Sequence, residues 1–146
     1  METYLDETTL ARIEQCIADA EQHTSAEIRV HIEDECAGSA LDRAAFVFTS
    51  LKMHETALRN GILIYVSMET RKAAIIGDKG IHEKVEPTYW QDLLNAMLAQ
   101  FKQAAYEKGL TDIVAQVGVL LSTHYPIRAN DINELSNKVT NAKDLH

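Results

Sequence analysis

Asp78 stands between two glycines in the segment Gly77-Asp78-Lys79-Gly80, directly after a run of residues typical of a β-strand. A carboxylate in such a turn can combine its own oxygens with backbone carbonyl oxygens, because glycine tolerates tight turns. Hard cations such as Ca²⁺ and Mg²⁺ prefer oxygen ligands of these kinds. The segment therefore predicts a cation ligand. The alternative interpretation is that Asp78 only caps the N-terminus of a helix that follows it.

Four further polar residues become site candidates if folding brings them to Asp78. Glu27 and Asn60 offer oxygens to a cation, and Arg59 and Ser25 offer donors to a phosphate group. The alternative for Arg59 and Asn60 is an ordinary turn role, and Glu27 alone would be a solvated strand residue. Together with Asp78 these residues are the five candidate residues.

The acidic run Glu33-Asp34-Glu35 is a rival cation site. It lies at the other end of the strand that begins near Glu27. Its spacing is not that of an EF-hand calcium loop, and the alternative interpretation is an acidic loop that is simply solvated.

The elements that must position these residues follow from the hydrophobic pattern. Helical spacing and two-residue alternation distinguish helices from strands, and the run Ile-Leu-Ile-Tyr-Val is apolar on both faces, which indicates a central strand. The predicted order is a helix over residues 6–22, a strand over 26–33, a helix from Ser39 or Ala40, and strands over 62–66 and 71–77.

The lengths of the connections predict the strand directions. A helix joins the first strand to the second, which favours a parallel pair, and the short link over residues 68–70 makes the third strand antiparallel to the second. The first two strands then begin at the edge where the third strand ends. This arrangement brings the five candidate residues together and places the acidic run at the opposite edge.

The second half of the chain predicts two more helices. Pro87 suits the first turn of one helix, for which Gly109 is the expected C-terminal cap, and a further helix ends before Pro126. Helices that cover both faces of a central strand predict the α/β class, as a three-layer α/β/α sandwich with a mixed central sheet. We expect a single domain over residues 1–126 and a polar C-terminal tail or short helix over residues 127–146.

Composition excludes several classes of function. The 22 acidic and 14 basic residues give a net charge of −8, which argues against a nucleic-acid binder. No apolar run approaches the ~20 residues that span a bilayer, and the N-terminus lacks the pattern of a signal peptide, so a cytoplasmic location is expected. Dinucleotide, P-loop, nucleophile-elbow and His-Glu-x-x-His motifs are missing from the sequence.

Several segments in order resemble the TPM domain family, which includes thylakoid lumen acid phosphatases and photosystem II repair proteins. The matching segments are TSAEIRVHI, RNGILIYVSMETRKAAIIGDKGIHEKV, YWQDLLNAMLAQFKQAAYEKGLTDIVAQVG and HYP, within residues 24–126. The resemblance implies a Rossmann-like sandwich of the cytoplasmic, single-domain bacterial branch. It also implies binding of a divalent ion, either Ca²⁺ or Mg²⁺, with Asp78, Glu27 and Asn60 as the site residues carried over.

Three hypotheses of function follow. The first is a cation-binding interaction or regulatory module, with a divalent metal ion and a protein as its partners. The second is a metal-assisted acid phosphatase acting on phosphomonoesters, an activity that the resemblance implies for plant members. Because no general base is evident beside Ser25, we expect catalysis to be weak or absent. The third is an assembly protein that acts through its helices and tail.

Overall fold

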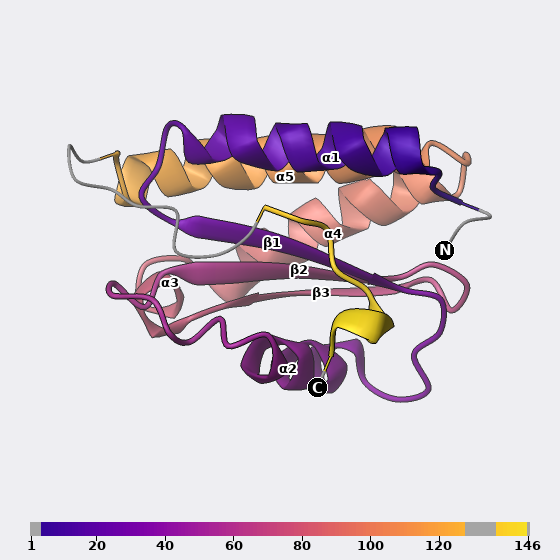
Figure 1. Cartoon of the computed structure of the whole chain (residues 1–146), viewed down its shortest axis with the longest axis horizontal. Coiled ribbons are helices and arrows are strands. Elements are labelled where there is room, and N and C mark those ends of the chain that lie inside the picture. The colour runs from indigo at the N-terminus through magenta and orange to yellow at the C-terminus, as the bar shows by residue number, and fades with distance from the viewer. Residues whose placement is uncertain (1–3, 128–136, 146) are drawn as a thin grey trace.

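The computed structural model describes residues 4–127 and 137–145 (Figure 1). Within them a three-stranded sheet runs in the order β1 (Glu27–Glu33), β2 (Gly61–Ser67) and β3 (Lys72–Gly77). β1 and β2 are parallel, with Glu27 opposite Gly61, and β3 is antiparallel to β2, with Ile62 opposite Gly77. The predicted strand directions are therefore confirmed.

Helices cover both faces of this sheet, as the pattern predicted. The helices are α1 (Glu7–Glu21), α2 (Ala40–Ser50), α3 (Lys79–His82), α4 (Pro87–Phe101) and α5 (Tyr106–His124), with a short 3₁₀ helix, η1 (Ala142–Asp144). Figure 1 shows α1, α4 and α5 on one face of the sheet and α2 on the other. The three-layer α/β/α sandwich is confirmed, and no helix in the described ranges is both long and apolar enough to cross a membrane.

The core follows the alternation along β2. Ile62, Ile64 and Val66 belong to the hydrophobic cluster under α1, α4 and α5, whereas Leu63 and Tyr65 belong to the cluster under α2. Successive side chains of a strand point to opposite faces, so a strand that is apolar throughout can be buried on both sides. β2 is fully buried, as expected for the central strand.

The C-terminal segment covers the outer edge of β1. Thr140 donates its backbone N–H to the carbonyl of Val30 at 3.0 Å, and its own carbonyl accepts from Ile32 at 2.9 Å. The polar side chains of β1 are buried too, so the interpretation of Glu27 as a solvated strand residue is wrong. The predicted tail over 127–146 is only partly within the structure, because residues 128–136 lie outside the described part.

The boundary between α4 and α5 differs from the prediction. α4 ends at Phe101, and Gly109 lies in the first turns of α5 rather than capping the preceding helix. A Cβ atom on Gly109 would lie 2.8 Å from Cε1 of Phe101. The glycine is therefore required for close packing of the two helices, while Ala104, at φ 60°, reverses the chain between them.

Candidate functional site

The five candidate residues lie at one edge of the sheet, which we call the amino-end edge because β1 and β2 begin there. Contacts join Ser25 and Glu27 to Asn60, and a separate ion pair joins Arg59 to Asp78. Asn60 accepts from the backbone N–H of Glu27 at 3.3 Å. The side-chain amide of Asn60 donates to the carbonyl of Ser25 at 3.1 Å. Asp78 donates its N–H to the carbonyl of Gly61 at 2.8 Å, which ties the end of β3 to the start of β2. The convergence follows from the strand directions.

An ion pair between Arg59 and Asp78 lies on the β2–β3 side of this edge. The Nε of Arg59 donates to Oδ2 of Asp78 at 2.7 Å, and a terminal guanidinium nitrogen donates to Oδ1 at 2.9 Å. The side chain of Arg59 is 50% exposed, whereas that of Asp78 is 6% exposed. Burial acts to raise the pKa of Asp78, but the hydrogen bonds from Arg59 and Lys79 outweigh it, so the pKa of Asp78 is lowered and the carboxylate is charged.

Asp78 also caps α3, as the alternative interpretation predicted. Its Oδ1 accepts from the backbone N–H of Lys79 at 2.7 Å. The cap and the ion pair use both carboxylate oxygens at once. A capping role is therefore present, and it does not exclude a ligand role, because Oδ1 accepts two hydrogen bonds but Oδ2 accepts only one, from Arg59, and keeps a second lone pair.

The backbone at the start of α3 packs closely against the loop before β2. Arg59 has φ 50°, in the left-handed region, and its carbonyl accepts from the N–H of Gly80 at 2.9 Å. A Cβ atom on Gly80 would lie 2.9 Å from the carbonyl oxygens of both Leu58 and Arg59. Gly80 therefore lets α3 approach the loop before β2, which brings Asp78 within reach of the guanidinium.

Glu21 is a residue of this edge that the sequence analysis missed. Its Oε2 accepts from the backbone N–H of Ile28 at 2.7 Å. Burial, together with the charge of Glu27 and a hydrogen bond with it, raises the pKa of Glu21 to about 8 against the effect of the Ile28 N–H. An acidic residue in the last turn of a helix is disfavoured by the helix dipole, and this was the available signal.

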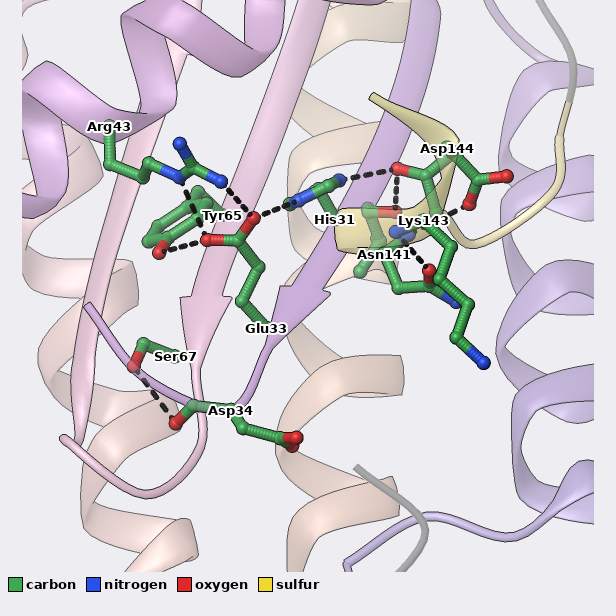
Figure 2. A network of polar contacts seen from close by, with 11 residues as sticks. His31, Glu33, Asp34, Arg43, Tyr65, Ser67, Asn141, Lys143 and Asp144 are labelled. Atoms are coloured by element: carbon green, nitrogen blue, oxygen red, sulfur yellow. Dashed lines mark hydrogen bonds and ion pairs between the residues drawn. The ribbon is translucent and has the colours of Figure 1, made fainter. Parts of the chain in front are cut away.

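The opposite, carboxyl-end edge holds a second acid–arginine pair within a larger network (Figure 2). Arg43 donates to Glu33 through Nε at 2.9 Å and a terminal nitrogen at 2.7 Å, and Tyr65 donates its hydroxyl to Oε1 at 2.9 Å. Burial acts to raise the pKa of Glu33, but the hydrogen bonds from Arg43, His31 and Tyr65 lower it to about 2. The carboxylate is charged and surrounded by donors.

His31 connects this network to the C-terminal segment. Its Nε2 lies 3.0 Å from Oε2 of Glu33 and its Nδ1 lies 2.8 Å from the hydroxyl of Thr140. The ring is fully buried and stacks on Tyr65, and burial lowers the pKa of His31 despite the neighbouring carboxylate. The imidazole is therefore neutral at pH 7, with one nitrogen as donor and the other as acceptor.

The structure separates the members of the rival acidic run. Glu33 is buried in the network, whereas Asp34 and Glu35 are exposed, and Figure 2 shows the side chain of Asp34 pointing away from Glu33. No group of three His, Cys, Asp or Glu side chains that could hold a metal ion occurs among residues 4–127 and 137–145. A cation would accordingly need amide, backbone or water oxygens beside one or two carboxylates.

A mixed sheet between two helical layers, with a polar edge at the start of its parallel strands, defines an α/β/α domain of the Rossmann-like kind. The family model for the TPM domain matches residues 1–120. The chain therefore belongs to the TPM domain family.

Solved structures agree with this assignment. The NMR structure of the BA42 protein from the psychrophilic bacterium Bizionia argentinensis is 40% identical, with a TM-score of 0.87 over 95% of this chain and 96% of that one. The N-terminal domain of cg2496 from Corynebacterium glutamicum (14% identity, TM-score 0.63, 85% and 78% covered) shows the fold alone. So does an N-terminal domain from P. gingivalis (14% identity, TM-score 0.63, 87% and 83% covered). The comparison with curated proteins gave no match.

Proposed function

We propose that this TPM-domain protein is a cation-binding module whose amino-end edge binds a divalent ion, Ca²⁺ or Mg²⁺, together with a phosphate group. The observation that carries the proposal is the bidentate pair of a half-exposed Arg59 and a buried Asp78 at an edge where three chain segments meet. The guanidinium of Arg59 suits the phosphate group, and the carboxylate of Asp78 suits the cation.

The pair can open by exchanging partners. A phosphate group accepts two parallel hydrogen bonds from a guanidinium, as the carboxylate of Asp78 does now. A divalent ion then takes the carboxylate that Arg59 releases. If the ion bound alone, it would lie beside an uncompensated guanidinium, so we expect cation and phosphate to bind cooperatively.

The donor set suits such a shared site. Mg²⁺ usually keeps several waters and binds through one or two carboxylates plus phosphate oxygens, so three acidic side chains are not required. In this proposal Asp78 and the side-chain oxygen of Asn60 are ligands, Glu27 adds negative charge, and Ser25 donates to the phosphate. The amide nitrogen of Asn60 is already used by the carbonyl of Ser25, which leaves its oxygen for the ion.

The decisive experiment separates the capping role of Asp78 from a ligand role. Asn is among the best N-cap residues, so Asp78→Asn keeps the cap and removes the charge. We expect Ca²⁺ or Mg²⁺ to raise the melting temperature of the wild type, more strongly with phosphate present, and to leave Asp78→Asn unchanged. Asp112→Asn, which removes a paired acid in α5, is the matched control. A full metal response in Asp78→Asn would refute the assignment.

A substitution of Arg59 tests whether cation and phosphate bind cooperatively. Asn tolerates the left-handed conformation that Arg59 adopts, so Arg59→Asn removes the guanidinium with little backbone strain. We expect the cation to bind this variant without help from phosphate, because no arginine competes for Asp78. A phosphate effect as large as in the wild type would contradict the exchange.

Metal-assisted hydrolysis of phosphomonoesters is the second candidate, favoured by the same Arg59–Asp78 pair. The hydroxyl of Ser25 has only the carbonyl of Tyr125, at 3.5 Å, as a partner in the described structure, so it lacks a general base. Turnover of p-nitrophenyl phosphate that depends on metal and is lost in Asp78→Asn would establish this activity. An unchanged rate in the variant would indicate a contaminant.

The cytoplasmic location and a protein partner remain predictions from the sequence. Cell fractionation checks the location. Deletion of residues 127–146, followed by partner capture and a metal titration, checks whether the tail binds a protein. This deletion also removes the contacts of Thr140 with β1, so its folding must be verified first.

A further inference from the structure

A cavity of about 360 Å³ lies away from the amino-end edge, where the β2–β3 turn meets the end of α4. Four separate segments line it: the chain before α1, the β2–β3 turn, the last turns of α4 and the start of α5. Its volume is within the range of about 300–1,000 Å³ that small-molecule sites occupy. The function proposed above gives these segments no role.

One wall of the cavity is aromatic. The ring of Tyr106 meets the rings of Tyr4 and Phe101 edge to face, with centroids 5.2 and 5.5 Å apart. Phe101 is held against Gly109, where a side chain would clash with it. The three rings and Leu98 present a fixed apolar surface, which suits the flat or aliphatic body of an organic molecule.

Two cations line the same cavity. Arg71 comes from the β2–β3 turn and Lys102 from the end of α4. Neither side chain makes a hydrogen bond or an ion pair with another residue in the part of the chain that the structure describes. Among the described residues, the lining contains these two cations and no acidic side chain, so it favours an anion over a cation.

Two of the four non-glycine residues with positive φ in the described structure lie in the loops beside this cavity. Arg71 has φ 54° and Ala104 has φ 60°, so each loop beside the cavity holds a residue with a side chain in the left-handed region. This conformation is unfavourable for such residues and persists where the surrounding structure fixes it, often next to ligand sites.

We propose that this cavity binds a small organic anion, with an aromatic or aliphatic body against the rings and a carboxylate, sulfonate or phosphonate head at Arg71 and Lys102. Asn95, also in the lining, supplies a further polar contact. A neutral ligand would leave both cations uncompensated, and a cationic ligand would be repelled. The head and the body are both needed, which distinguishes this site from the metal-coupled phosphate site at the amino-end edge.

Phenylphosphonate is the probe, because it carries both parts and resists hydrolysis. The ligand is titrated into ¹⁵N-labelled protein in the absence of divalent metal, and amide shifts are followed by NMR. Methylphosphonate supplies the head without the ring, and benzyl alcohol supplies the ring without the charge. We expect saturable shifts at Met68, Ala99 and Tyr106 with phenylphosphonate, and an affinity about tenfold weaker or more for the other two.

Two variants of different kinds keep the test decisive. Ala99→Leu fills the cavity at an exposed helical position where leucine is a good helix former, and we expect it to abolish binding. Arg71→Asn removes the charge but introduces a residue that tolerates φ 54°, and it should weaken binding about tenfold. Lys52→Asn is the matched control, since Lys52 is also an exposed cation in the left-handed region, at φ 58°, next to α2.

Three outcomes would overturn the proposal. The first is the absence of saturable shifts at millimolar phenylphosphonate, and the second is equal affinity for benzyl alcohol, which would make the cations irrelevant. The third is binding that Ala99→Leu and Arg71→Asn leave unchanged. Shifts centred on Asp78 instead would assign the anion to the amino-end edge and would also refute a separate site.

Discussion

The two edges of the sheet carry the same chemical unit in opposite settings. At each edge an arginine holds a carboxylate through two parallel hydrogen bonds: Arg43 with Glu33, and Arg59 with Asp78. Glu33 also receives bonds from His31 and Tyr65, and Arg43 is 35% exposed. Asp78 has the guanidinium and one backbone N–H, and its arginine is 50% exposed.

The difference shows which pair can exchange partners. A carboxylate surrounded by four donor atoms on three side chains loses several hydrogen bonds at once if it is released, so the Glu33 network is structural. The pair at the amino-end edge gives up one guanidinium that already reaches water. An arginine–carboxylate pair is therefore a structural element at the carboxyl-end edge and a candidate binding element at the amino-end edge.

Glu33→Gln should have the largest effect on stability. It removes the charge that Arg43 and His31 face in a buried position, and we expect the free energy of unfolding to fall by about 3 kcal/mol in urea denaturation at pH 7. Glu35→Gln, which changes an exposed acid of the same run, should remain within about 0.5 kcal/mol of the wild type.

The pH dependence of this effect has a definite sign. The pKa of Glu33 is lowered to about 2, so its contribution is complete above its unfolded pKa of 4.5 and disappears as the pH falls toward 2. The difference in the free energy of unfolding between the wild type and Glu33→Gln should decrease as the pH falls from 4.5 to about 2. A gap that stays constant would show that packing, rather than charge, makes Glu33 important.

Glu21→Gln should have the next largest effect, with the opposite pH dependence. Because the pKa of Glu21 is raised from 4.5 to about 8, the folded protein holds a proton that the unfolded chain releases, and wild-type stability falls as the pH rises between these values. The variant lacks this loss, so by pH 8 its free energy of unfolding should rise by about 2 kcal/mol relative to that of the wild type. The upper limit for such a change is about 1.4 kcal/mol for each pH unit between the two pKa values. Glu7→Gln, at an exposed site of α1, is the control, and parallel pH profiles for Glu21→Gln and wild type would contradict the prediction.

Thr140→Val should have a smaller effect. Valine keeps the shape of the side chain but leaves Nδ1 of the buried His31 without its hydroxyl partner, which we expect to cost about 1 kcal/mol in thermal or urea unfolding. Thr49→Val, at an exposed position of α2, is the control. Equal effects of the two substitutions would show that the C-terminal segment does not support the network.

Asp78→Asn should change stability least and the metal response most. The asparagine keeps the cap of α3, and the lost ion pair involves an exposed arginine, so we expect a melting temperature close to that of the wild type without metal. A loss of stability as large as in Glu33→Gln would break the comparison, because both edges would then be structural.

The sequence predicted the fold and the meeting of the five candidate residues, but it could not predict how those residues are bonded. Connection lengths predicted the directions of β1, β2 and β3, and the parallel pairing of β1 with β2 then places Ser25 within hydrogen-bonding distance of Asn60. The role of Gly109 was misjudged, because a glycine after a basic residue resembles a helix cap. Its real partner, Phe101, becomes adjacent only when α4 and α5 pack.

Two-residue alternation and connection length are local properties, so the sequence by itself determined the sandwich and the glycine-flanked carboxylate at the end of β3. Only the tertiary structure decided which charges are buried. The segment around Thr140 covers β1 from more than a hundred residues away, and the pairing of Glu21 with Glu27 depends on how α1 packs against that strand. Burial and pKa depend on contacts between distant segments, and no local pattern encodes such contacts.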